Sequence, residues 1–208
     1  MASKKEKVYD SRQIVEKYLH HKLAKSGHAW EEEGGEEGEE DEEEEGGGGE
    51  ENRVHQAPAA VHGALREAGD ELERLYQSDL TEMAGRLELE PAVASRSFAA
   101  VADELFRDEV NWGRIVAFLE FGAAVCVERR RAAESITADV ARWMTEYLNG
   151  PVLKGWIRDN GGWDAFVDLN GRQKESVFSS SWPSIVSVFS LAALGAVGFT
   201  IGAYLAQK

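Results

Sequence analysis

One charged residue stands inside the most apolar stretch of the chain. The run from Trp112 to Val127 is almost wholly apolar, yet Arg114 lies one turn into it. A guanidinium group is costly to bury unless it is paired and hydrogen-bonded, and it binds carboxylates in a bidentate manner. Asn111 is a favourable N-cap, which places Arg114 in the first turn of a helix, where a side chain can point outward. We therefore expect this charge outside the core.

Residue types that serve catalysis or metal binding are sparse. All five histidines lie in the first third of the chain, and none has metal-ligand spacing with the single cysteine, Cys126. The sequence contains no phosphate loop, GxSxG elbow or CxxC motif. The short basic run 129–131 is flanked by Glu128 and Glu134, so it forms no basic patch. The sequence predicts no enzyme, no metal or other cofactor and no nucleic acid binding.

The negative charge is concentrated in one segment. The chain has a formal net charge of −15, and residues 31–51 contain only acidic residues and glycine. Such a segment repels itself and has no apolar area to bury, so the sequence predicts a disordered loop over 31–60. Such a loop would serve either as a solvated spacer or as a segment that attracts a basic partner electrostatically.

A long apolar segment lies near the C-terminus. Residues 185–206 carry no charge, and 22 helical residues are long enough to cross a hydrocarbon core of about 30 Å. Trp182 and Tyr204 lie near its ends, where interfacial aromatic residues are typical. A core helix of a soluble domain is the alternative. We expect a transmembrane tail anchor behind a polar linker, 173–184, with the rest of the chain facing the cytosol.

Helical periodicity dominates the remaining chain, and no run alternates cleanly enough to predict strands. The predicted helices cover about 11–25, 61–76, 95–106, 112–127, 136–148, 152–159 and 163–169. Asp10 and Gln13 resemble a capping box before the first helix. The predicted fold class is all-α: a helical bundle over 61–172, joined by the helix within 1–30, in which a central apolar helix hairpin is wrapped by amphipathic helices.

Four blocks resemble the homology motifs of the B-cell lymphoma two (BCL-two) family of apoptosis regulators. Residues 9–30 resemble the fourth motif, 61–76 the third, 104–122 the first and 156–167 the second. The combination of Asn-Trp-Gly-Arg and a later Asp-Asn-Gly-Gly-Trp-Asp is highly specific. The chain looks most like the family's founding, anti-apoptotic member.

The resemblance implies a surface groove that accepts the amphipathic death-motif helix of a pro-apoptotic relative. Arg114, within the motif that also contains Asn111 and Gly113, would pair with the aspartate of that helix. The residues that would line the pockets of the groove are Leu72, Tyr76, Leu80, Met83, Val101, Leu105, Ala117 and Phe121. Ordinary core packing is the alternative for each of them, as an intrachain ion pair is for Arg114. The chain's own death-motif core would be Leu65, Gly69 and Asp70.

Two positions depart from the family pattern. Glu109 stands where the family has glycine, five residues before Arg114. Its carboxylate could clash with the ligand, repel the ligand aspartate or pair with Arg114 itself, and each would weaken capture. Asn170 stands where the family usually has a tyrosine that borders the groove.

The function implied by the resemblance is that of an anti-apoptotic regulator. It would hold pro-apoptotic relatives in the groove and block permeabilisation of the mitochondrial outer membrane. It would lie on the cytosolic face of the mitochondrial outer membrane, the endoplasmic reticulum or the nuclear envelope, and it could form a homo- or heterodimer. Two alternatives stay open: a pro-apoptotic, pore-forming relative, and a groove made inactive by Glu109.

Overall fold

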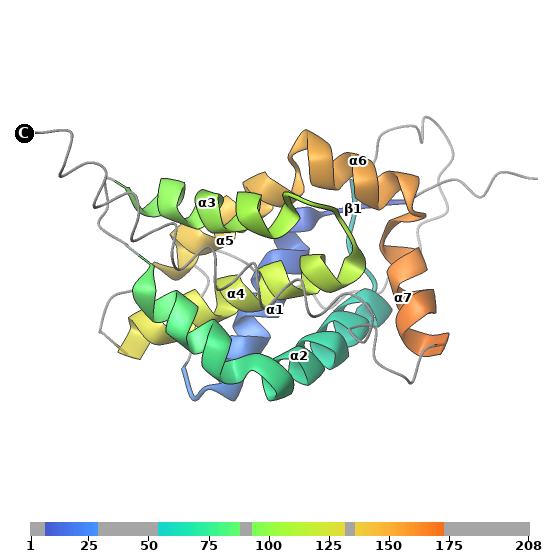
Figure 1. Ribbon diagram of the computed structural model, residues 1–208. Helices are drawn as coiled ribbons and strands as arrows, with labels where there is room; N and C mark the ends of the chain where they lie inside the picture. The colour runs from blue at the N-terminus through green and yellow to red at the C-terminus, as the bar shows by residue number, and fades with distance from the viewer. Residues whose placement is uncertain (1–6, 29–53, 88–92, 132–135, 173–208) are drawn as a thin grey trace, which may run out of the picture.

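The computed structural model describes residues 7–28, 54–87, 93–131 and 136–172. The elements in chain order are β1 (Val8–Tyr9), α1 (Ser11–Lys25), β2 (Val54–His55), α2 (Ala59–Arg86), α3 (Ala94–Phe106), α4 (Trp112–Arg131), α5 (Thr137–Leu148), α6 (Pro151–Asp159) and α7 (Gly162–Arg172). Figure 1 shows α4 inside a bundle formed by the other helices. The predicted all-α class and the helical bundle are confirmed over these residues.

Helix α4 occupies the centre because nearly every face of it is apolar. Its residues from Ile115 to Leu119 are fully buried, and α4 packs against α1, α2, α3 and α5. The rings of Phe98 on α3 and Phe121 on α4 stack with centroids 5.2 Å apart. Gly122 lets α5 approach closely, since a Cβ atom there would overlap the sulfur of Met144. The predicted apolar hairpin is thus the packed pair α4 and α5.

The starts of α1 and α4 follow local sequence signals, whereas α2, α3, α5 and α6 begin without a side-chain cap, and α2 continues to Arg86, beyond the predicted end at residue 76. The Asn111 side chain accepts a hydrogen bond from the Arg114 amide at 2.9 Å, which confirms it as the N-cap of α4. Asp10 caps α1 in the same way, through the Arg12 amide. The Gln13 side chain does not complete the predicted capping box, because it accepts from the amide of Ala57 at 2.8 Å.

Two short strands were not predicted from the sequence. β1 and β2 pair in parallel, with Val8 opposite Val54 and Tyr9 opposite His55. Two-residue strands are too short to show alternation, so periodicity could not reveal them. Residues 54–60, which belong to the predicted disordered loop, therefore form β2 and the start of α2.

Several predicted segments lie outside the described residues. They are residues 31–53 of the acidic loop, the linker 173–184 and the apolar segment 185–206. Among the described helices, none has the length and the apolar character needed to cross a bilayer. Cys126 is a buried free thiol in α4.

Candidate functional site

The Arg114 side chain lies inside the core, so the expectation that its charge stays outside was wrong. It is only 1% exposed. Its Nη1 atom donates a hydrogen bond to the backbone carbonyl of Leu105 at 2.5 Å. Leu105 belongs to the last turn of α3, where carbonyl groups lack intrahelical partners and the helix dipole is negative. The end of a neighbouring helix thus makes the burial of this guanidinium tolerable.

Glu109 pairs loosely with the buried arginine. Its Oε1 atom lies 3.9 Å from Nε of Arg114, and its side chain is 56% exposed. The same oxygen accepts a hydrogen bond from Nδ2 of Asn111 at 2.9 Å. Asn111 therefore caps α4 with its oxygen and orients Glu109 with its nitrogen, while Gly113 is buried in the first turn of α4. Of the three effects considered for Glu109, the structure contains the pair with Arg114.

The residues predicted to line the groove lie close together, but their side chains are buried in the core. Seven of them are buried, namely Leu72, Leu80, Met83, Val101, Leu105, Ala117 and Phe121. The eighth, Tyr76, is partly buried against the same cluster. They lie where α2 and α3 pack on α4, and we call this burial of the predicted groove residues the closed arrangement. A partner helix could contact these buried side chains only after a part of the bundle around them had moved.

The chain's own death-motif core is engaged within the fold. Leu65 is fully buried, and Gly69 lies where α2 passes closest to α1 and α4. A Cβ atom at Gly69 would overlap the hydroxyl of Tyr18 and the carboxylate of Glu120. Asp70, the next residue, is bound by lysines of α1. These three positions therefore hold α2 against the rest of the bundle.

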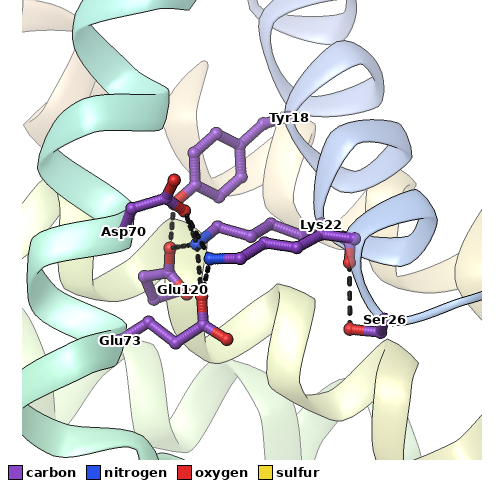
Figure 2. Close-up of polar contacts among 7 residues, drawn as sticks. Tyr18, Lys22, Ser26, Asp70, Glu73 and Glu120 are labelled. Atoms are coloured by element: carbon purple, nitrogen blue, oxygen red, sulfur yellow. Dashed lines mark hydrogen bonds and ion pairs between the residues drawn. The ribbon is translucent and has the colours of Figure 1, made fainter.

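Figure 2 shows a polar cluster around Asp70 that joins α1, α2 and α4. Lys22 of α1 lies at its centre and is almost fully buried. The Lys22 Nζ atom lies 2.8 Å from Asp70, 2.9 Å from Glu73 and 2.6 Å from Glu120. Tyr18 donates its hydroxyl hydrogen to the same Glu120 oxygen. We call Tyr18, Lys22, Lys25, Asp70, Glu73 and Glu120 the three-helix cluster.

Lys25 completes the cluster from the surface side. Its Nζ atom lies 3.0 Å from Asp70 and 2.9 Å from Glu73. It is about half exposed, whereas Lys22 and Glu120 are each 4% exposed. The two lysines thus contact the same α2 carboxylates in very different surroundings.

The charges of the cluster do not balance. It contains three carboxylates and two ammonium groups, and Glu120 is the deepest of the carboxylates. Burial raises the pKa of Glu120 to about 7, although Lys22 and Tyr18 act in the opposite direction. Burial alone would lower the pKa of Lys22, but the three carboxylates outweigh it and raise that pKa. Glu120 is therefore the carboxylate of the cluster whose protonation changes closest to neutral pH.

Sequence reasoning missed this cluster. A signal was present, because Glu120 interrupts an apolar helix just as Arg114 does, and Lys22 lies on the apolar face that contains Tyr18. The partners could not be identified, since Tyr18 and Glu120 are 102 residues apart in the sequence.

Two further expectations concern Asn170 and metal binding. The Asn170 amide donates to Glu67 of α2 at 3.1 Å, so the residue that replaces the family tyrosine links α7 to α2. Among the described residues, no group of three His, Cys, Asp or Glu side chains is arranged to hold a metal ion.

Comparison with known proteins identifies the family. Residues 65–163 match the profile of the apoptosis regulator proteins of the Bcl-2 family. The chain is 42% identical to apoptosis regulator Bcl-2 of Gallus gallus, over 96% of this chain and 97% of that protein. It is 41% identical to apoptosis regulator Bcl-2 of Canis lupus familiaris over the same shares.

A second group of relatives matches a shorter region. The chain is 51% identical to Bcl-2-like protein 1 of Rattus norvegicus over 114 residues, which are 54% of this chain and 48% of that protein. Regulators of this family are not enzymes, in agreement with the sparse catalytic residues of the sequence. The chain belongs to the Bcl-2 family of apoptosis regulators, and within it the full-length similarity is to apoptosis regulator Bcl-2.

Proposed function

We propose that this regulator is anti-apoptotic. It binds the amphipathic death-motif helix of pro-apoptotic family members in a hydrophobic groove between α2, α3 and α4. By holding these relatives it prevents permeabilisation of the mitochondrial outer membrane. Support comes from the full-length similarity to proteins named apoptosis regulator Bcl-2, and from the surroundings of Arg114.

Arg114 carries the proposal. Its side chain is buried, its Nη1 atom donates to the carbonyl of Leu105, and the Glu109 carboxylate lies 3.9 Å from its Nε atom. A ligand aspartate at hydrogen-bond distance would give a charge-assisted, bidentate pair in place of that loose contact. Apolar residues surround the arginine and would receive the apolar anchors of the same ligand helix.

Binding requires the closed arrangement to open, and α2 contains a position suited to this movement. Tyr76 interrupts the helix with φ −134° and ψ 21°. The part of α2 before Tyr76 is held by the three-helix cluster, while the part after it contains Leu80 and Met83. A shift of the second part would expose these apolar side chains, and the ligand would cover them again.

The proposal includes attachment to a membrane through residues 185–206. The chain would then lie on the cytosolic face of the mitochondrial outer membrane, the endoplasmic reticulum or the nuclear envelope. It would meet its partners there as heterodimers, with homodimers also open to it. Imaging of the chain with a fluorescent N-terminal tag tests this part, and a signal confined to the plasma membrane would contradict it.

The Glu109 carboxylate would compete with the ligand aspartate for Arg114. We expect Glu109→Gly to bind a labelled death-motif peptide about tenfold more tightly than the unchanged chain, because the ligand aspartate no longer displaces or faces a carboxylate. The measurement is fluorescence anisotropy on the full chain in lipid nanodiscs. Glu82→Gln removes an exposed carboxylate from α2 and serves as the control, with an unchanged dissociation constant.

Two results would contradict the proposal. Equal affinities for the unchanged chain and Glu109→Gly would mean that the ligand aspartate does not approach Arg114. Release of dye from liposomes by the activated chain alone would indicate the pore-forming alternative instead of an anti-apoptotic regulator.

A further inference from the structure

A cavity lies between α3, α5 and α6, away from the residues predicted to line the groove. Its volume is about 630 Å³. It shares no residue with those proposed to contact the partner helix. Cavities of about 300 to 1,000 Å³ are the usual size for small organic ligands. The size of this cavity therefore points to a small molecule.

The cavity has aromatic walls and a solvent-exposed apolar rim. Phe98 and Phe106 line it from α3, and Trp143 and Tyr147 from α5. Phe98 lies 5.7 Å from Trp143, and Phe106 lies 5.8 Å from Tyr147, between ring centroids. Val152 at the start of α6 also lines the cavity, and it is 64% exposed. An apolar ligand body would cover surface that water now contacts.

Two carboxylates lie beside the Tyr147 end of the cavity. Asp103 accepts a hydrogen bond from the Tyr147 hydroxyl at 2.8 Å. The side chain of Glu146, the neighbour of Tyr147 on α5, makes no ion pair or hydrogen bond with another described residue. Burial and Asp103 raise the pKa of Tyr147, so the phenol stays protonated and leaves the carboxylate charges in place. Arg96 also lines the cavity, but it lies seven residues before Asp103, about 10 Å away along α3.

We propose that this cavity binds a small organic cation with an apolar body, such as an arylalkylammonium. The body would fill the space between Phe98, Phe106 and Trp143. The ammonium group would lie near Glu146 and Asp103, where its attraction to the two carboxylates would favour a cation over a neutral or anionic group. A neutral or anionic ligand has no positive charge to pair with these carboxylates. The apolar segment 185–206 of the same chain carries no charge either, so it is a less suitable occupant of the cavity.

Three probes that share one body test the charge preference. They are 4-(4-fluorophenyl)butylammonium, the matching butanol and the matching butyrate, measured by ¹⁹F NMR against the full chain in nanodiscs, with empty nanodiscs as the reference. We expect the cation to bind about fivefold more tightly than the alcohol and the carboxylate to bind most weakly. Equal affinities for the three probes would overturn the proposal, because the cavity would then select no cation.

Matched variants locate the site. Glu146→Gln and Asp103→Asn should remove most of the preference for the cation, whereas Glu67→Gln on the exposed face of α2 should not change it. Ala99→Leu, which adds volume inside the cavity without changing its charge, should abolish binding of all three probes. Undiminished binding to Ala99→Leu would overturn the proposal.

Binding in the cavity should be independent of binding in the groove. A saturating death-motif peptide should leave the affinity of the cation unchanged, because the two sites share no residue and the movement proposed for peptide binding lies in α2, which does not line the cavity. Displacement of the cation by the peptide would overturn the assignment to a separate cavity. Binding that appears only after removal of residues 182–208 would also count against it, since that segment would then be the occupant.

Discussion

Replacing Lys22 with methionine is expected to lower the free energy of unfolding by about 3 kcal/mol at pH 7.5. Methionine preserves the volume and the apolar stem of the side chain but removes the ammonium group. Three carboxylates then lose their shared partner, and Glu120 remains buried with an uncompensated charge or must take up a proton. Removal of one member of a buried ion pair typically costs about 3 to 5 kcal/mol. Chemical denaturation followed by circular dichroism measures the change.

Lys25→Met is the matched control for this prediction. Lys25 contacts the same Asp70 and Glu73 oxygens as Lys22, at 3.0 and 2.9 Å, but from a half-exposed position. Exposed ion pairs contribute less than about 1 kcal/mol, so we expect Lys25→Met to cost less than that. A similar loss in both variants would mean that burial at the centre of the three-helix cluster does not determine its contribution.

The stability difference between the unchanged chain and Glu120→Gln is expected to fall by about 2 to 3 kcal/mol between pH 5 and pH 8. The pKa of Glu120 is raised in the folded chain from 4.5 to about 7. Between these values the folded state holds a proton that the unfolded state has lost. The contribution of Glu120 is therefore present below pH 4.5 and is lost as the pH rises through about 7. Glutamine does not titrate and supplies the reference.

The difference between variants is needed because other groups titrate in the same range. Burial lowers the pKa of His62 from 6.5 to about 4, so its contribution to stability rises with pH across the same window. Hydrogen bonds from Lys22 and Lys25 lower the pKa values of Asp70 and Glu73 despite burial, and those groups act below about pH 4.5. A stability difference that is constant with pH would show that Glu120 is ionised throughout.

Local features of the fold could be predicted from the sequence. The first helix begins and ends where Asp10 and the apolar spacing indicated, at Ser11 and Lys25. Asn111 caps α4 as expected, because capping depends on residues three positions apart. The two-residue strands were missed, since pairing between residues 8 and 54 leaves no periodic pattern.

The surroundings of the buried charges could not be predicted. The acceptor for Arg114 is a backbone carbonyl at the end of another helix. Every residue has a backbone carbonyl, so the residue types do not indicate which one accepts this hydrogen bond. The loose pair with Glu109 was one of three alternatives that spacing alone could not separate. The three-helix cluster needed the packing of α1, α2 and α4 before its members could be recognised.

The central claim is that Arg114 binds the aspartate of a partner helix. The most direct test is a double-mutant cycle in which the full chain and Arg114→Gln are each titrated with a death-motif peptide and with its Asp→Asn analogue. Circular dichroism first establishes that Arg114→Gln keeps its helix content. We expect a coupling free energy of at least about 1.5 kcal/mol between the two side chains, as found for close charge pairs at interfaces. A coupling near zero, with both peptides losing the same affinity on Arg114→Gln, would contradict the claim and leave Arg114 as a residue that serves only the core.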